Sequence, residues 1–499
     1  MKLLQRFKRI VPAFFGGTLI IFSSLAISSC SCSSPEKVKF ISMSNTGILS
    51  NYFALYTKDV PITSAQQYPI DTYASTGAKV NATYSITPSL PEGLSFNNKN
   101  GVISGTPVSE SPEAQFTIKA KYQKFTDEET IGIEVDDGGA YKTLNSSDSA
   151  LTGWNVTSGD LTFWYSKGTN KICRIYDGDG RDNPTTASPT TRCAASGLNI
   201  KKTISFVPEG SSIITTYDVV GVRENAFLAN VDIAGSLTFP QDCDKSFHIF
   251  QNAFGFCTKL FDDIKFPNKL ASIGTRAFER ASRETPGLFI RLIFNSQSTI
   301  QLIPDYCFDR ARLGNLVGPT SNIGLPTSLK KIGKWAFSNS QIHGDVIFPE
   351  GLLEIDEYAF TGYGDKVVAQ NGDMRMKIIN LPDSLTTLGQ GAFYWSTFQD
   401  EDGLTNELKL GEHLQYMGRR AFALLSINVL TVRTPYATLN EWAGSGDSNA
   451  IFWDWKSFST GGGSHHFSTG VIIANTPSYN PVSKLNSVSY QCPSWRYVI

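Results

Sequence analysis

The chain has 499 residues, of which 41% are hydrophobic and 18% charged, and its formal net charge is −1. This length is too great for one compact core, so we expect several modules in series. The nearly balanced charge gives no basic face, which argues against nucleic acid as a partner. After the first 29 residues, no stretch of the sequence is apolar and long enough to span a bilayer.

Residues 1–29 have the composition of an export signal. Basic residues open the segment, an apolar run extends from Ile10 to Ile27, and two serines precede Cys30. A cysteine directly after small residues resembles a bacterial lipobox. The resemblance implies that Cys30 carries the lipid and that the protein is anchored at the bacterial cell membrane, on its outer side. An ordinary secretory signal and an uncleaved anchor are the alternatives.

A serine-rich start makes residues 30–44 a candidate tether, and residues 45–136 have the pattern of β-strands. Phe116, Ile118 and Ala120 alternate with polar residues, as do Ile131 and Ile133. Alternation with a period of two places such residues on one face of a strand. We therefore expect a module of strands that buries these two apolar series.

Two motifs in this module carry a resemblance. They read Leu-Pro-Glu-Gly-Leu-Ser-Phe at 90–96 and Gly-Val-Ile-Ser-Gly-Thr-Pro at 101–107. Both resemble the hallmark of the putative Ig family of bacterial surface proteins. This resemblance implies an immunoglobulin- or cadherin-like β-sandwich, usually a spacer that holds a distal module off the surface.

Some relatives of that family bind calcium at a module edge, so the late acidic residues need an interpretation. We interpret them as a solvated strand edge and linker, and expect no metal and no cofactor; the residues are Asp127, Glu128, Glu129, Asp136 and Asp137.

Residues 137–205 are predicted to form a β-rich cap between the sandwich and the segment that follows. The aromatic-rich run Leu161–Tyr165 indicates a strand. Cys173 and Cys193 flank a polar segment, and an export compartment would permit a disulfide between them. That disulfide would close the polar segment into a loop.

A phenylalanine recurs eight times between residues 206 and 435, at intervals of 23 to 33 residues, usually after Ala and often within Ile-Gly-x-x-Ala-Phe. The eight are Phe227, Phe254, Phe278, Phe308, Phe337, Phe360, Phe393 and Phe422. Such a period indicates a solenoid, in which each unit buries its apolar edge only against its neighbours. We expect all eight rings in the core.

Each unit also contains an alternating apolar pair followed by proline, such as Ile264 and Phe266 before Pro267. This pattern predicts a short strand that ends at the proline, because proline cannot donate to a ladder. The Leu-x-x-Ile-Gly phrase that follows predicts a tight turn, with Gly274 and its equivalents available for positive φ. Together the motifs resemble BspA-type leucine-rich repeats. The fold class is therefore mostly β, an Ig-like sandwich followed by a solenoid of about eight units.

Beyond Pro435 the recognisable periodicity ends, and residues 436–499 are predicted to cap the solenoid. The tail is rich in tryptophan, which could seal the exposed last repeat or form a platform for sugars. We favour the seal, because an uncovered last repeat would leave unpaired strand edges.

The functional prediction is a non-enzymatic surface lipoprotein whose repeats bind a protein partner in adhesion to a host or to other cells. The sequence contains none of the common nucleophile, metalloprotease, or nucleotide-binding motifs. Capture of a polysaccharide or nutrient polymer and a purely structural envelope role are the alternatives. Aromatic residues at variable positions would discriminate: one exposed face would favour sugars, and burial between turns would favour proteins or scaffolding. They are Trp335, Tyr358, Tyr394 and Trp395.

The lipobox resemblance predicts that Cys30→Ala abolishes labelling of the protein by a radioactive fatty acid in a bacterial host. Removal of the thiol removes the only atom to which the lipid could be attached in this assignment. Cys32→Ala serves as the matched control and should be labelled like the unaltered protein. Labelling that persists in Cys30→Ala would contradict the assigned lipid site.

Overall fold

A computed structural model describes the chain over residues 41–44, 49, 52–74, 79–177, 193–284, 288–314, 323–340, 342–362, 375–377, 381–394, 397–398, 407–411, 413–418, 421–422, 429–432, 471–474 and 496–498. The predicted signal, Cys30, the segment 178–192, Trp395 and most of the tail lie outside the described residues. Strands and turns make up almost all of the described chain. Its 3-10 helices are η1 (Ser64–Gln66) and η2 (Ser149–Leu151), and none of its helices is long and apolar enough to cross a membrane.

The N-terminal module is a β-sandwich, as the sequence predicts. A four-stranded sheet in the order β2-β9-β8-β5 packs with the sheet β1-β3-β4 and the hairpin β6-β7. The strands are β1 (Ile41–Ser44), β2 (Phe53–Thr57), β3 (Asp71–Ala74), β4 (Lys79–Val80), β5 (Thr83–Thr87), β6 (Leu94–Phe96), β7 (Ile103–Gly105), β8 (Ser111–Tyr122) and β9 (Phe125–Asp136).

The two alternating series form the centre of the sandwich. Ile118 and Ala120 on β8, and Ile131 and Ile133 on β9, are fully buried. The module also begins earlier than expected, because Ile41–Ser44 pairs with β3 and buries Ile41. The predicted tether at 30–44 is therefore too long by four residues.

The cap starts both sheets of the solenoid. β10 (Ala140–Asn145), β12 (Asp160–Tyr165) and β13 (Ile172–Asp177) are antiparallel, and β13 then pairs in parallel with the first repeat strand, β16 (Thr215–Val222). On the other side, β11 (Val156–Ser158) pairs antiparallel with β14 (Ala194–Asn199), which continues in parallel to β17 (Ile233–Thr238). A further strand, β15 (Thr203–Phe206), pairs with β16. Because the cap strands pair with the first repeat, neither β16 nor β17 is an edge strand; the N-terminal edges of the two sheets are β10 and β11.

The repeat strands form two parallel rows, here called sheet 1 and sheet 2, and most repeats contribute one strand to each. Strand pairing is interrupted after Ile273 in sheet 1 and after Ile293 and Phe398 in sheet 2. Sheet 1 holds β16, β18 (Phe247–Ile249), β20 (Leu270–Ile273), β22 (Leu302–Ile303), β24 (Lys331–Ile332), β26 (Glu354–Ile355), β28 (Thr387–Leu388) and β31 (Tyr416–Met417). Sheet 2 holds β17, β19 (Leu260–Lys265), β21 (Ile290–Ile293), β23 (Ile323–Gly324), β25 (His343–Ile347), β27 (Arg375–Lys377) and β29 (Thr397–Phe398), and its C-terminal part holds β30 (Glu407–Leu410) and β32 (Val429–Val432).

The strands of sheet 2 correspond to the short strands predicted before the prolines. The strands of sheet 1 were not predicted. The phrase expected to form only a tight turn contains the sheet 1 strand, which in most units is two residues long. So short a strand shows no alternation in its own sequence. It exists because the neighbouring repeats supply its ladder partners.

The solenoid also continues past residue 435, where its periodicity was expected to stop. β33 (Val471–Ala474) pairs in parallel with β32, and β34 (Arg496–Val498) pairs in parallel with β33. The tail therefore adds two strands in the same direction as sheet 2. The tryptophans of the predicted seal lie outside the described residues.

The repeated glycines are required for close approach and not for positive φ. A Cβ built on Gly274, Gly389 or Gly418 would lie 2.2 to 2.4 Å from a backbone nitrogen of the preceding repeat. None of the three has a positive φ; that conformation belongs to the residue two positions before each of the first seven phenylalanines, such as Arg276 (φ 60) and Trp335 (φ 57). The expectation of positive φ at these glycines was therefore wrong.

The turns hold the repeats together by a second backbone ladder. In each turn the phenylalanine N–H donates to the carbonyl of the alanine or cysteine before the next phenylalanine; for Phe278, Phe308 and Phe337 the distances are 2.9, 2.7 and 2.8 Å. The rings then stack at centroid distances of 5.0 to 5.5 Å through the whole series. All eight rings are buried in one continuous core.

Gly333→Ala should destabilise the protein by about 1–3 kcal/mol, the usual cost of overpacking a tight site. Its Cβ would lie 2.8 Å from the Asp305 nitrogen and 2.9 Å from the Pro304 carbonyl carbon, neither of which can move without shifting the stack. The matched control is Gly324→Ala, whose Cβ would meet nothing within 4 Å. Urea unfolding midpoints measure the difference, and equal midpoints for the two variants would contradict the close-approach account.

Candidate interaction surfaces

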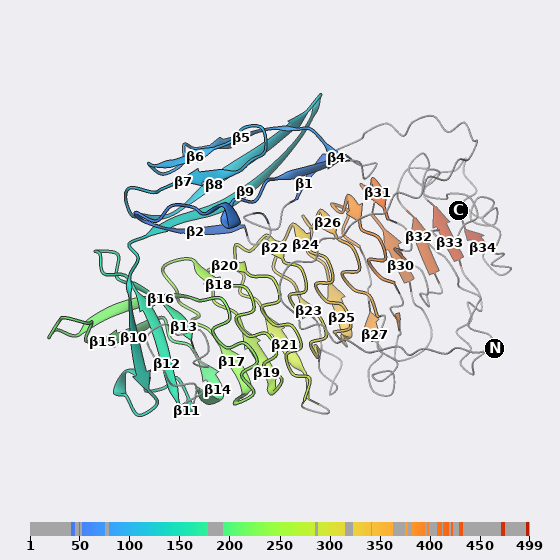
Figure 1. The fold of residues 1–499 in the computed structure, drawn as a ribbon. Coiled ribbons are helices and arrows are strands. Elements are labelled where there is room, and N and C mark those ends of the chain that lie inside the picture. Colours follow the sequence, from blue (N-terminus) through green and yellow to red (C-terminus); the bar gives the residue numbers. More distant parts are fainter. Residues whose placement is uncertain are drawn as a thin grey trace, which may run out of the picture.

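The sandwich does not extend away from the repeats, as a spacer would. It lies along sheet 1, while the strands of sheet 2 face away from it (Figure 1). The expected role as a spacer that holds the repeats at a distance is therefore not the arrangement of this structure. Which surface of the solenoid is open depends on how far the sandwich covers sheet 1.

The coverage is seen in one row of outward side chains on sheet 1, which pair across neighbouring strands. His248, Ser272 and Leu302 in this row are only 2%, 5% and 7% exposed. The Phe53 ring of β2 stacks on the His248 ring at 3.8 Å, and Glu113 Oε2 of β8 lies 3.1 Å from His248 Nε2. The outer surface of sheet 1 is thus an interior surface of the protein over its first repeats.

The cap is joined to the sandwich by a buried ion pair. Arg174 of β13 is fully buried, and its Nη2 donates to the two carboxylate oxygens of Glu134 at 2.7 and 2.6 Å. The guanidinium also lies over the Trp164 ring, 5.2 Å from its centroid. Removing one partner of such a pair leaves an uncompensated buried charge, so the pair fixes the sandwich on the cap.

Further along the row, charged groups meet at the interface. Lys331 of β24 donates to Glu354 Oε1 at 2.9 Å and lies 3.3 Å from Asp356 Oδ2. Burial alone would lower the pKa of Lys331, but Glu354 and Asp356 outweigh it and raise the pKa well above its usual value. The Lys331 side chain is therefore a permanent cation beneath the sandwich.

Opposite this lysine the sandwich places two carboxyl groups whose pKa values are raised. Burial and, to a lesser extent, the Asp127 charge raise the pKa of Glu129 to about 7, although the Tyr52 hydroxyl donates to Glu129 Oε2 at 2.8 Å. Burial also raises the pKa of Asp127, whose Oδ2 accepts the Met43 N–H at 2.7 Å. Lys331 lowers both carboxyl pKa values, and Glu354 raises that of Glu129.

The late acidic residues of the sandwich thus serve the interface and the linker. Glu128 pairs with Lys119 on the exposed side of β9, Asp136 accepts the Gly138 N–H, and Asp137 accepts the Gly139 N–H. Within the residues that the structure describes, no group of three or more His, Cys, Asp or Glu is arranged to hold a metal.

The aromatic residues singled out in the repeats form a stack along one line of turns. Trp335 and Tyr358 are half-buried and stack on each other at 4.5 Å, and Tyr306 stacks on Trp335 at 6.3 Å. Arg276 covers the free face of Tyr306 at 4.5 Å. Gly391 lies against the far face of Tyr358, where an added Cβ would come within 2.4 Å of the ring.

Every ring face in this stack is therefore occupied by a neighbour. A sugar could reach only the ring edges, so the stack is no platform for sugars. Tyr394, the third predicted contact, is half-buried. Its backbone carbonyl accepts the Gly362 N–H of the preceding turn at 2.9 Å. Trp395 lies outside the described residues.

Sheet 2 presents an open and chemically mixed surface. Its outward residues include Lys265 and Arg291, whose side chains are 45% and 53% exposed, and Ile347, which is 52% exposed. Arg291 Nε donates to Asp263 Oδ1 at 2.7 Å across neighbouring strands. Apolar, cationic and anionic groups thus lie side by side on this face.

Cys173 and Cys193 are free thiols in the structure, so the disulfide considered from the sequence is not present. Cys173 belongs to β13 in one sheet, and Cys193 directly precedes β14 in the other. Both side chains are fully buried in the cap core. Burial raises the pKa of Cys193 to about 12 and that of Cys173 further, so both thiols remain protonated and act as small apolar groups.

Because Glu129 keeps its proton on folding, stability should fall as the pH rises. The unfolded carboxyl ionises near its ordinary value of 4.5 and the folded one near 7, so the folded state binds more protons in between. We expect Glu129→Gln to flatten this loss between pH 5 and 8 and to stabilise the protein at pH 8 by on the order of 2 kcal/mol. Urea unfolding at pH 5 and pH 8 measures the free energy of unfolding of the variant and of the unaltered protein.

Glu128→Gln is the matched control for this prediction, because Glu128 lies on the opposite face of the same strand and is exposed. It should leave the pH dependence unchanged. An unchanged slope in Glu129→Gln would show that this carboxyl is not held at the interface.

Comparison with known proteins supports both parts of the fold. The family model "BspA type Leucine rich repeat region" matches in six copies over residues 221–363, 303–450 and 368–472, which together span half of the chain. The model "Putative Ig domain" matches residues 48–136. The repeat match ends inside β33, in agreement with parallel strands beyond residue 435. Comparison with curated proteins gives no match.

Among solved structures, a leucine-rich repeat protein from T. pallidum is 22% identical, with 46% of this chain and 84% of that chain covered and a TM-score of 0.29. A leucine-rich repeat protein from Bacteroides ovatus is 14% identical, with 69% and 99% covered and a TM-score of 0.23. Human protocadherin-24 EC1-2 is 10% identical, with 36% and 97% covered and a TM-score of 0.17.

The leucine-rich repeats indicate a role in protein interaction or at the cell surface, and both matched families generally consist of binding or structural modules. The chain belongs to the BspA-type leucine-rich repeat family and carries an immunoglobulin-like domain ahead of its repeats.

Proposed function

We propose that this protein is a lipid-anchored surface protein that binds a protein partner through the outer face of sheet 2, in adhesion to a host or to other cells. The lipobox-like sequence at Cys30 supports the anchor and the extracytoplasmic location. The repeats support the binding mode, since a solenoid offers a long surface whose exposed residues can vary without disturbing the core.

One observation carries the choice of surface. On sheet 1 the outward residues His248, Ser272 and Leu302 are buried under the sandwich, whereas on sheet 2 Lys265, Arg291 and Ile347 are about half exposed. A partner that approached sheet 1 over the first repeats would first have to displace the sandwich. Sheet 2 can be reached without any rearrangement.

The chemistry of sheet 2 favours a protein over a polysaccharide. Exposed Arg and Ile side chains beside an acidic residue can form ion pairs and apolar contacts, which are typical of protein interfaces. Sugar binding depends on free aromatic faces, and those of Tyr306, Trp335 and Tyr358 are occupied. We therefore rank polymer capture below protein binding, and a purely structural role below both.

The test is a binding screen against extracellular-matrix proteins and glycans, with the full chain and two charge-reversal variants. Lys265→Glu/Arg291→Glu alters sheet 2 and should weaken binding of a protein partner by about tenfold or more, or about 1.4 kcal/mol. Lys119→Glu/Lys121→Glu, on the sandwich strand β8 and away from sheet 2, is the matched control and should bind like the unaltered chain.

Three results would count against the proposal. Equal binding by both variants would exclude sheet 2 as the contact surface. Binding to glycans alone would favour polymer capture. Absence of binding to every matrix protein and glycan would favour a structural role in the envelope.

A further inference from the structure

A second binding site is suggested by the free edge of the sandwich. β2 is the outermost strand of its four-stranded sheet, and among the described strands it pairs with β9 alone. The Tyr52 carbonyl accepts the Gly132 N–H, and the Lys58 N–H donates to the Asp136 carbonyl, both at 2.9 Å. Peptide groups in a strand alternate in direction, so even-numbered residues bond to β9. The N–H and C=O groups of Phe53 and Leu55 therefore point to the other side, where the described chain offers them no strand.

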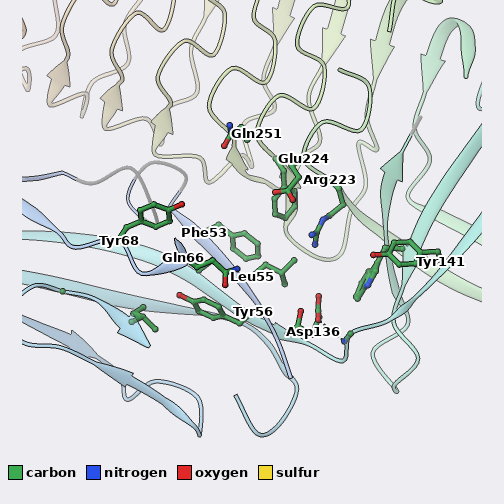
Figure 2. A pocket seen from close by; sticks show the side chains of 17 residues that line it. Phe53, Leu55, Tyr56, Gln66, Tyr68, Asp136, Tyr141, Arg223, Glu224 and Gln251 are labelled. Atoms are coloured by element: carbon green, nitrogen blue, oxygen red, sulfur yellow. Dashed lines mark hydrogen bonds between the residues drawn. The ribbon is translucent and has the colours of Figure 1, made fainter. Parts of the chain in front are cut away.

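That unpaired edge opens on a pocket. The pocket has a volume of about 460 Å³ and is lined by every residue of β2 from Phe53 to Thr57. The wall opposite the strand comes from the cap and the first repeats and includes Tyr141, Arg223 and Phe250. Figure 2 shows Arg223 reaching from the repeats toward the sandwich, between Phe53 and Tyr141. Pockets of this size bind ligands in many proteins.

Arg223 in this pocket has no carboxylate within ion-pair distance among the described residues. Its guanidinium lies over the Phe250 ring at 5.3 Å, and its Nε is buried and has no hydrogen-bond partner. It forms no ion pair within 4.0 Å in the described chain. Burial also lowers the pKa of Arg223, since a desolvated guanidinium is less stable as a cation. Arg223 is half-buried, so its guanidinium is only partly hydrated, and a carboxylate would compensate the lost hydration.

The acidic residues nearby do not fill that role. Asp136 accepts the Gly138 N–H at 3.0 Å and a hydrogen bond from the Thr57 side chain. Glu224 is exposed, and although its charge favours the Arg223 cation, its carboxylate does not lie within 4.0 Å of the guanidinium. The pocket therefore combines a free strand edge with a cation that has no carboxylate within ion-pair distance in the described chain, and one ligand could meet both features.

We propose that an extended peptide segment of a partner protein adds to β2 as a further strand in this pocket and places an acidic side chain on Arg223. Main-chain hydrogen bonds to Phe53 and Leu55 would supply affinity that is largely independent of sequence, and Arg223 would select for the acid. The site is separate from sheet 2, so its failure in an experiment leaves the proposed function of sheet 2 untouched, and the reverse holds as well.

Capped pentapeptides test this proposal, because β2 offers five residues for pairing. The probe has the sequence Thr-Val-Asp-Val-Thr, whose outer residues favour strands, and comparison peptides carry Asn or Lys in place of Asp. Calorimetric titration of the full chain with each peptide should show that the Asp peptide binds about tenfold more tightly than the Lys peptide. Two N-methylated forms of the Asp peptide carry the methyl groups on one or the other alternate set of amides. The form methylated on the amides that face β2 should not bind, and the other form should bind.

Two pairs of variants locate the site. Arg223→Gln should remove the preference for Asp over Asn, whereas Arg291→Gln, on sheet 2, should retain it. Leu55→Pro removes an N–H that points away from β9, so the sheet can keep its ladder while peptide binding is lost. Leu55→Ala keeps that N–H and should still bind.

The outcomes separate clearly. Equal affinity for the Asp, Asn and Lys peptides, or unchanged Asp preference in Arg223→Gln, would overturn the assignment of Arg223. Binding of both N-methylated peptides would overturn strand addition, and this result does not depend on the folding of any protein variant. No binding of the Asp peptide at about 1 mM would overturn the site as a whole.

Discussion

The structure depends on how closely the backbone of one repeat lies against the next. In four of the eight repeats a glycine lets the turn contact the backbone of the preceding repeat, where a side chain would collide; these glycines are Gly274, Gly333, Gly389 and Gly418. This contact allows the phenylalanine N–H of one turn to bond to the next turn and brings the rings to stacking distance. Backbone ladder and ring stack together fix every repeat in the same orientation, so no repeat is stable by itself.

A regular stack produces straight rows of outward residues, and the two sheets use their rows differently. The row on sheet 1 receives the sandwich, with Phe53 on His248 and a network of carboxyl groups around Lys331. The row on sheet 2 remains open. The immunoglobulin-like module is therefore part of the same packed body as the repeats, and it decides which face of the solenoid is available for binding.

The sequence was sufficient to predict whatever recurs or alternates. The phenylalanine series predicted the buried rings, and the alternation around Ile118 and Ile131 predicted the core strands of the sandwich. Sheet 1 was missed because strands such as Lys331–Ile332 are too short to show a period. The role of the glycines was misjudged because a close approach between backbones and a turn with positive φ both require glycine, and the sequence alone does not distinguish the two.

The interface residues could not have been predicted, because each depends on contacts between distant parts of the chain. His248 meets Glu113 across 135 positions of sequence, and neither residue stands in a motif. Glu129 has a raised pKa only because the sandwich is packed on the repeats. The edge of β2 and Arg223 likewise become neighbours only in the folded protein.

Chemical modification of histidine tests the central claim that the sandwich covers sheet 1. His248 is 2% exposed beneath Phe53, whereas His413 is exposed on a later repeat and provides an internal reference. Treatment of the full chain with diethylpyrocarbonate, followed by peptide mass spectrometry, should modify His413 and leave His248 unmodified. In Phe53→Asp, which should displace the sandwich, His248 should become reactive. Modification of both histidines at the same rate in the unaltered chain would contradict the account.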